Sequence, residues 1–95
     1  MNLTWRRRAL RQLDLIYDYI SQFDPAAADT VSLAIEEAAI RLKSFPRLGR
    51  PSHKTDVRLL QVPGRPYLLP YRLTNNSVEI LAVVDERMER PPEWL

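Results

Sequence analysis

The sequence predicts an α+β fold of order β-α-α-β-β-β, in which a helical hairpin packs on a small antiparallel sheet. Two observations lead to this prediction. Apolar residues recur at helical spacing in the first half of the chain, whereas short β-branched and aromatic runs separated by turn sequences follow Pro46. The chain has only 95 residues, of which 45% are apolar, so it has room for one hydrophobic core. We therefore expect one domain that spans residues 1–95.

The first half of the sequence predicts a short edge strand followed by two helices. The strand is expected in the first four residues, and a helix over about 5–22 because six apolar residues share one face of a helical wheel: Trp5, Ala9, Leu13, Ile16, Tyr17 and Ile20. Asp24 and Pro25 are typical of a helix start, so a second helix is expected from there to about Ser44. Its expected core positions are Ala28, Val31, Ile35, Ala38 and Leu42. The short connection between the helices predicts an antiparallel hairpin.

The second half of the sequence predicts a three-stranded antiparallel meander. The turn sequences 63–66 and 74–77 separate three strand-like runs, which are Val57–Val62, Tyr67–Leu73 and Val78–Val84. Pro70 lies inside the second run and cannot donate to a ladder, so we expect a bulge or an unpaired edge there. Tyr67 and Tyr71 share a face of this strand with Leu69 and Leu73, which predicts core positions.

Positive charge is concentrated in the middle of the sequence. Segment 46–73 has six basic residues against one acidic residue, Asp56, a local balance of +5, whereas the whole chain carries +2. The six are Arg47, Arg50, Lys54, Arg58, Arg65 and Arg72. Such a segment attracts phosphate groups or an acidic protein segment. The alternative is a solvated strand face on which arginine stems lie along apolar surface.

Composition argues against several classes of site. The chain has no cysteine and a single histidine, His53, so a usual zinc site with three or four ligands is not expected. With two glycines there is no glycine-rich phosphate loop. No apolar stretch approaches the roughly 20 residues of a membrane span. We expect a cytoplasmic protein without metal, cofactor or membrane association.

Several short motifs follow one another in a characteristic order. They are Leu13-Asp14-Leu15-Ile16-Tyr17-Asp18-Tyr19-Ile20, Phe45-Pro46, Leu48-Gly49-Arg50, Val57-Arg58-Leu59, Pro70-Tyr71-Arg72 and the run from Val78 to Val84. In this order and spacing, the chain resembles the RelE and ParE superfamily of bacterial toxins from type II toxin-antitoxin modules. The resemblance implies a toxin that a cognate antitoxin holds inactive. RelE-like members cleave messenger RNA on the ribosome, whereas ParE-like members inhibit DNA gyrase.

The residues expected for RNA cleavage are incomplete. Cleavage needs a group that takes the 2′-hydroxyl proton, positive charge at the phosphate and a group that protonates the leaving oxygen. Many members of the superfamily have a histidine after the last strand, where this chain has Asp85, and an exposed aspartate titrates near ~3.9. No tyrosine follows Arg87. We expect no catalytic residue, and a ribonuclease would have to use Arg50, Arg58, Arg72, Asp85 and Arg87. Arg58 and Arg72 have the alternative role of binding carboxylates such as Asp85 or Glu86.

Two sets of residues are candidates for protein contacts. The expected target-binding residues are Arg58, Arg65, Arg87, Arg90 and Trp94, where Trp94 is an aromatic anchor or instead folds back onto the sheet. Apolar residues on the helix faces opposite the core predict a surface that an antitoxin segment covers. The expected antitoxin-binding residues are Leu15, Tyr19, Leu33 and Ile40. Scattered exposed apolar residues are the alternative interpretation.

The sequence therefore favours a ParE-like, non-enzymatic toxin that inhibits DNA gyrase by protein contact and is neutralised by a cognate antitoxin. One alternative is a RelE-like messenger RNA endonuclease that acts on the ribosome. The other is an inactive relative that only binds its antitoxin.

Overall fold

The computed structural model describes residues 1–87 of the chain. Two α-helices and six β-strands make up this part. In chain order they are β1 (Asn2–Trp5), α1 (Arg7–Ser21), α2 (Pro25–Arg41), β2 (Arg50–Pro51), β3 (Val57–Gln61), β4 (Tyr67–Leu73), β5 (Ser77–Ile80) and β6 (Val84–Asp85).

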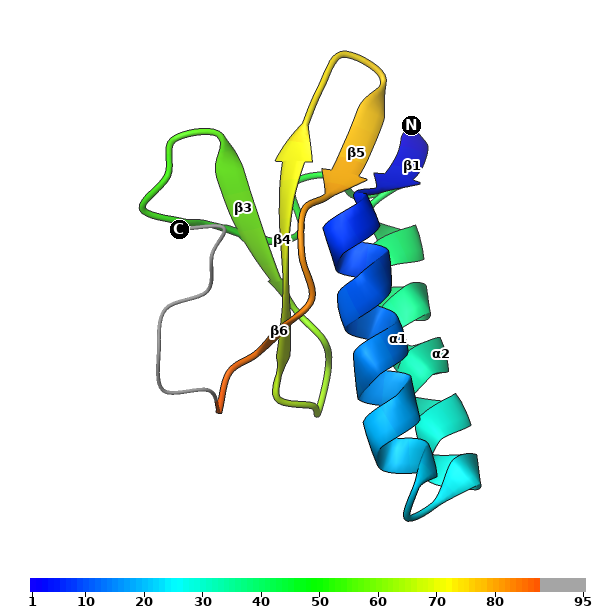
Figure 1. The fold of residues 1–95 in the computed structure, drawn as a ribbon. Coiled ribbons are helices and arrows are strands. Elements are labelled where there is room, and N and C mark those ends of the chain that lie inside the picture. Colours follow the sequence, from blue (N-terminus) through cyan, green and yellow to red (C-terminus); the bar gives the residue numbers. More distant parts are fainter. Residues whose placement is uncertain (88–95) are drawn as a thin grey trace.

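The strands form one mixed sheet, and both helices lie on one side of it (Figure 1). The sheet has the order β1-β5-β4-β3-β2, and β6 pairs with β4 beyond the end of β5. The predicted meander of β3, β4 and β5 is antiparallel as expected. However, β1 joins β5 in parallel, with Asn2 opposite Ser77 and Trp5 opposite Ile80. The sheet is therefore mixed rather than antiparallel. The long connection from β1 to β5, which includes the helical hairpin, allows these two strands to run parallel.

The helical hairpin is present, with boundaries that differ from the predicted ones by a few residues. Trp5, which was predicted to begin the first helix, is the last residue of β1, and α1 begins at Arg7. The predicted start of α2 is confirmed, because an Asp24 carboxylate oxygen accepts a hydrogen bond of 3.1 Å from the backbone N–H of Ala27, with Pro25 in the first turn. This helix ends at Arg41, before the predicted Ser44.

The third predicted strand is interrupted. Strand β5 ends at Ile80, and the chain pairs again with β4 only at Val84. The gap lies beside Leu69 and Pro70, where Pro70 has no N–H to donate and its carbonyl accepts from the N–H of Leu81. The expected disruption at Pro70 is present on the side toward β5 and β6, whereas on its other side Pro70 is paired with Leu59 of β3. Strand β2, of two residues, was not predicted because its length gives no detectable alternation. Strand β6 was predicted only in part, since Val84 was the last residue of the third predicted strand.

The hydrophobic core lies between the two helices and the sheet. All five expected core positions of α2 are buried, as are Tyr67, Leu69 and Tyr71 from β4. Leu73 is partly buried against the same cluster, together with Trp5. The expectation that the tyrosine face of β4 belongs to the core is therefore confirmed. Tyr17 was expected on the core face of the first helix, but it is exposed, and its hydroxyl donates to a carboxylate oxygen of Asp29 in α2 at 2.9 Å.

Candidate functional site

Tyr71 and Arg58 fix the loop that connects α2 to the sheet. The buried Tyr71 hydroxyl donates to the Pro46 carbonyl at 2.8 Å and accepts from the Gly49 N–H at 2.9 Å. Arg58 donates to the carbonyls of Gly49 at 2.9 Å and Arg47 at 3.2 Å. Arg58 therefore has the structural role that the sequence left open, with backbone carbonyls as partners instead of the expected carboxylates.

Arg72 lies in an ion network that crosses the sheet. Its guanidinium contacts Asp56 at 3.2 Å and Glu79 at 3.3 Å, and Glu79 also pairs with Arg6 at 3.3 Å. The network joins Arg6, between β1 and α1, to β5, to β4 and to the residue before β3. Arg72 therefore binds carboxylates, as the structural alternative predicted, but these are Asp56 and Glu79 rather than Asp85 or Glu86.

Asp85 and Arg87 form a bidentate ion pair at the end of β6. The guanidinium of Arg87 donates to both carboxylate oxygens of Asp85, at 3.0 and 2.8 Å, and its backbone N–H donates to one of them at 2.9 Å. These hydrogen bonds hold the pKa of the Asp85 carboxyl below its ordinary value and raise the pKa of Arg87. A carboxylate held in this way is a weaker proton acceptor than a free aspartate.

The residues expected for a ribonuclease lie in separate parts of the described structure. Arg58 stands opposite Tyr71 in the register and so lies on the helix side of the sheet, whereas Arg72 stands opposite Val57 on the other side. Asp85 pairs with Tyr67, five residues along β4 from Arg72, which is roughly 17 Å along a strand. The expected catalytic set is not brought together.

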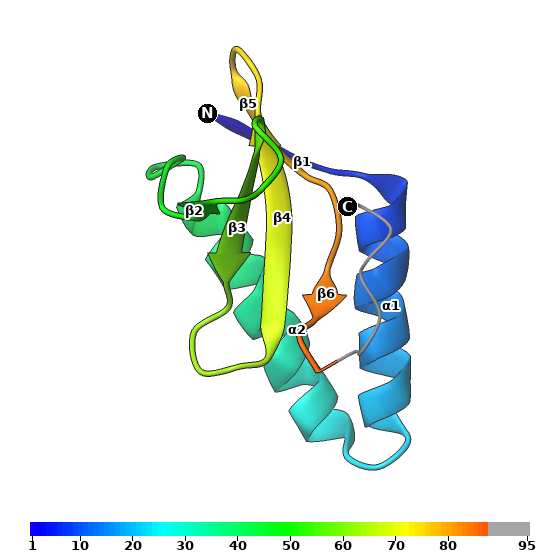
Figure 2. The same cartoon turned by 90° about the vertical axis from the view of Figure 1, so that its left-hand side faces the viewer.

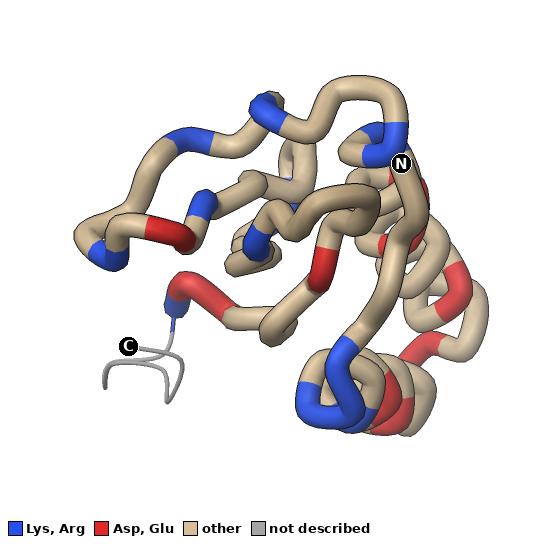
Figure 3. Tube along the Cα trace, turned by 90° about the horizontal axis from the view of Figure 1, so that it is seen from above, with Lys and Arg blue, Asp and Glu red and all other residues tan. Residues whose placement is uncertain are grey.

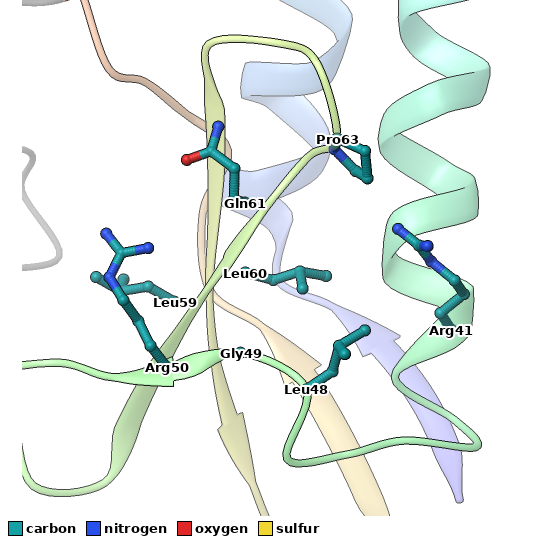
Figure 4. Close-up of a pocket in the computed structure, with 8 residues that line it drawn as sticks. All are labelled: Arg41, Leu48, Gly49, Arg50, Leu59, Leu60, Gln61 and Pro63. Atoms are coloured by element: carbon teal, nitrogen blue, oxygen red, sulfur yellow. The ribbon is translucent and has the colours of Figure 1, made fainter.

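A basic groove runs between α2 and the outer edge of the sheet. It consists of two adjoining hollows that share Arg41 and Pro63. Figure 4 shows the hollow at the β3 edge, and Ile40 and Arg65 line its neighbour. We call the combined feature the α2 groove; its lining residues are Ala34, Glu37, Ala38, Ile40, Arg41, Leu48, Gly49, Arg50, Leu59, Leu60, Gln61, Pro63 and Arg65.

An exposed apolar stripe lies along α1. Leu15, Tyr19 and Phe23 follow one another at intervals of four residues and so share a side of the helical path, and all are exposed. The rings of Tyr19 and Phe23 meet edge to face with centroids 5.5 Å apart. We call these residues the α1 stripe. Phe23 was missed as a candidate because it follows the helix, although its four-residue spacing from Tyr19 was a usable signal.

The expected antitoxin-binding residues are all exposed, by 55 to 65%, but they divide between two surfaces. Gln12 on α1 accepts a hydrogen bond from the N–H of Val83, so its side of the helix faces the segment before β6. Tyr19 lies seven residues on, on the same side, and it interacts electrostatically with Arg87. Figure 2 shows β6 between β4 and α1. Ile40 instead lines the α2 groove, and Leu33, seven residues before it, lies on the same outer side of α2.

The expected target-binding residues are also distributed. Arg65 lies in the α2 groove, Arg87 lies beside the α1 stripe, and Arg58 is held by the loop carbonyls. Arg90 and Trp94 lie outside the described residues. Figure 3 shows Lys and Arg positions recurring along the segment between α2 and β3, while Asp and Glu positions are frequent on the helices. Sequence reasoning missed Arg41, which only the fold places beside the basic middle segment.

Within residues 1–87, no group of three or more His, Asp or Glu side chains is arranged to hold a metal ion. The helices described here are too short or too polar to cross a membrane. What the described surface offers is an apolar stripe and a basic groove on a small α+β domain, which are features suited to contacts with macromolecules.

Comparison with known proteins places this small α+β domain in a family. The family model described as the ParE toxin of the type II toxin-antitoxin system parDE matches residues 3–90. Y4kP of Sinorhizobium fredii is 39% identical over 89 residues, which is 94% of this chain and 92% of that protein. Toxin RelE2 of Caulobacter vibrioides is 37% identical over 81 residues, 85% of this chain and 90% of that one.

Among solved structures, the chromosomal ParDE system from P. aeruginosa matches with a TM-score of 0.80 and 32% identity, over 90% of this chain and 95% of that one. A YoeB from Staphylococcus aureus, solved as a dimer, shares the fold with a TM-score of 0.59 at 18% identity, over 86% and 92% of the two chains. The chain belongs to the ParE family of toxins from type II toxin-antitoxin systems. Membership in such a system implies a cognate antitoxin as a partner.

Proposed function

We propose that this toxin inhibits DNA gyrase by protein contact and that its antitoxin neutralises it by covering the contact surfaces. The main observation behind the proposal is that the residues needed for RNA cleavage already bind other groups of the toxin. Arg58 is bound to loop carbonyls, Arg72 to two carboxylates and Asp85 to Arg87. These residues do not converge on one site, and Asp85 is not free to accept the proton that cleavage must remove. Membership of the ParE family also supports gyrase inhibition over RNA cleavage.

Neutralisation follows from the positions of the two candidate sets. Tyr19, expected to bind antitoxin, is close enough to Arg87, expected to bind the target, to affect its pKa electrostatically. In the α2 groove, Ile40 and Arg65 line the same hollow. An antitoxin segment on either surface would therefore cover an arginine that we assign to target binding. Direct occlusion needs no conformational change in the toxin.

A paired assay on the purified toxin, released from its antitoxin, tests the proposed activity. One arm measures supercoiling by DNA gyrase, and the other measures cleavage of messenger RNA on programmed ribosomes. We expect loss of supercoiling with intact RNA, and recovery of supercoiling when the antitoxin is added back. Cleaved RNA with unaffected gyrase would establish the RelE-like alternative and refute the proposal. If neither assay responds while the antitoxin still binds, the chain is an inactive relative.

Leu33→Glu tests the antitoxin-binding surface. Leu33 is 55% exposed on the outer side of α2, so the new charge stays in water and the fold is kept. We expect antitoxin affinity to fall roughly ten-fold, because a glutamate buried in an interface loses hydration without a partner. Titration calorimetry measures the affinity. Leu10→Glu, at a leucine that is 46% exposed outside both surfaces, is the control, and equal affinities for the two variants would remove Leu33 from the interface.

A further inference from the structure

The outer edge of β3 is only partly paired. Strand β2 covers Arg58 and Leu59 and does not reach Gln61. The N–H of Val62 donates toward β4, to the Tyr67 carbonyl at 3.0 Å. Because the backbone groups of successive strand residues point to opposite edges, the N–H and carbonyl of Gln61 point outward, into the α2 groove. The groove therefore contains a short length of sheet edge that can accept another strand.

Side chains flank this edge on both faces of the sheet (Figure 4). Arg41, Leu48 and Pro63 lie on the side of β3 toward α2, whereas Arg50 and Leu59 lie on the other side. An extended chain laid along the edge would send successive side chains alternately to these two sides. The groove thus offers backbone pairing together with a distinct environment for each set of side chains.

The charges of the groove are not neutralised within the described chain. Arg41, Arg50 and Arg65 form no ion pair with any residue among 1–87, in contrast to Arg72 and Arg87. The one acidic lining residue is Glu37. Apolar surface from Ile40, Leu48 and Pro63 lies between the arginines. Carboxylates on both faces of an added strand, with apolar side chains between them, would match this pattern.

We propose that the α2 groove binds a short, extended, acidic segment of the antitoxin, which adds as a strand at Gln61 and places carboxylates against Arg41, Arg50 and Arg65. The identity of the partner rests on the proposed function; the acidic, extended character of the segment rests on the geometry of the groove. A nucleic acid would also be attracted by three arginines, but it has no use for an outward-facing strand edge or for the apolar lining. The observations therefore favour a peptide.

Charge-reversal variants test the electrostatic part of the proposal. The affinity of the purified antitoxin is measured for Arg41→Glu, Arg50→Glu and Arg65→Glu by titration calorimetry at two salt concentrations. We expect each to weaken binding by roughly ten-fold or more at low salt and to flatten the dependence on salt. Arg7→Glu, at an exposed arginine at the start of α1 outside the groove, should stay within about two-fold of the parent. If all four variants lose the same affinity for the antitoxin, the effect comes from the net charge of the protein, and the proposal is refuted.

Amide hydrogen exchange tests the strand addition. Antitoxin binding should slow exchange of the Gln61 N–H by at least about ten-fold, because an amide that gains a ladder hydrogen bond exchanges only when that bond opens. An unchanged Gln61 amide in the saturated complex would refute strand addition. A single-stranded RNA oligonucleotide that binds the parent, loses affinity for the three groove variants and leaves Gln61 exchange unchanged would reassign the groove to nucleic acid.

The two proposals fail separately. If the antitoxin restores gyrase activity but the groove variants bind it as tightly as the parent does, the groove assignment is wrong and the proposed function stands. If the groove variants lose the antitoxin and Gln61 is protected, but gyrase is unaffected by the free toxin, the groove assignment stands and the proposed activity is wrong.

Discussion

Gly49 illustrates how one residue determines the shape of the α2 groove. A Cβ atom at this position would lie 2.6 Å from Cε1 of Tyr71 and 2.7 Å from the Leu59 carbonyl oxygen. Neither group can move cheaply, because the tyrosine ring is buried and the carbonyl belongs to β3. Glycine is therefore required by the close approach of the loop to the sheet.

Gly49→Ala should destabilise the protein by about 1–3 kcal/mol, the usual cost of overpacking a tight site. Gly64→Ala is the matched comparison, because its Cβ would meet nothing within 4 Å, although its φ of +70° costs about 1 kcal/mol of backbone strain. Urea unfolding of both variants measures the difference. A smaller loss for Gly49→Ala than for Gly64→Ala would show that the loop moves away from the sheet without cost.

Asp85 gives a prediction of pH dependence. Its folded pKa lies below the ordinary value of 3.8 because of Arg87, so its contribution to stability is fully present above 3.8 and is lost as the pH falls through the folded pKa. Asp85→Asn should therefore be less stable than the parent at neutral pH, and the two should converge in acid. Thermal unfolding across this range measures the difference. A stability difference that is constant with pH would show that the ion pair contributes nothing.

At the scale of the element, the start of α2 depends on its capping residue. Asp24→Ala removes the acceptor for the Ala27 N–H and should cost about 1 kcal/mol. Asp18→Ala, on the exposed side of α1, replaces an aspartate inside a helix, where alanine is favoured, and should be neutral or slightly stabilising. Urea unfolding distinguishes the two variants. Equal stabilities would mean that Pro25 alone sets the helix start.

Elements long enough to show a period were predictable. The helical spacing of apolar residues in α2 and their alternation in β4 indicated the helix, the strand and the buried face of each. Trp5 was assigned to the wrong element because its spacing fits the helical stripe, whereas its parallel pairing with Ile80 depends on a strand 75 residues away. The same limit applies to β2 and β6, which are strands only because β3 and β4 lie beside them.

At the scale of the whole molecule, Glu79 links parts of the chain that are distant in sequence. It pairs with Arg6 and Arg72, and its side chain is 28% exposed. Glu79→Gln should destabilise the protein by about 1 kcal/mol, since partly exposed pairs are screened by water. The effect should shrink at high salt. Thermal unfolding at two ionic strengths measures it, and a larger loss at high salt would exclude an electrostatic cause.

The sequence was sufficient to predict the α+β class, the helical hairpin, the antiparallel meander, the family resemblance and the concentration of charge in 46–73. These features follow from short-range patterns of polarity and from local turn and capping chemistry. It also indicated that Leu15, Tyr19, Leu33 and Ile40 lack core partners, because a helical wheel is a local construction.

The packing of the helices on the sheet, by contrast, establishes which of these residues are neighbours. It placed Ile40 with Arg41 and Arg65, separated them from Leu15 and Tyr19, and assigned Arg58 and Arg72 to structural contacts on opposite faces of the sheet. A periodic pattern shows which side of an element faces the core, but it carries no information about which elements become neighbours. That choice depends on long-range packing, which brings together residues whose separation along the chain gives no signal.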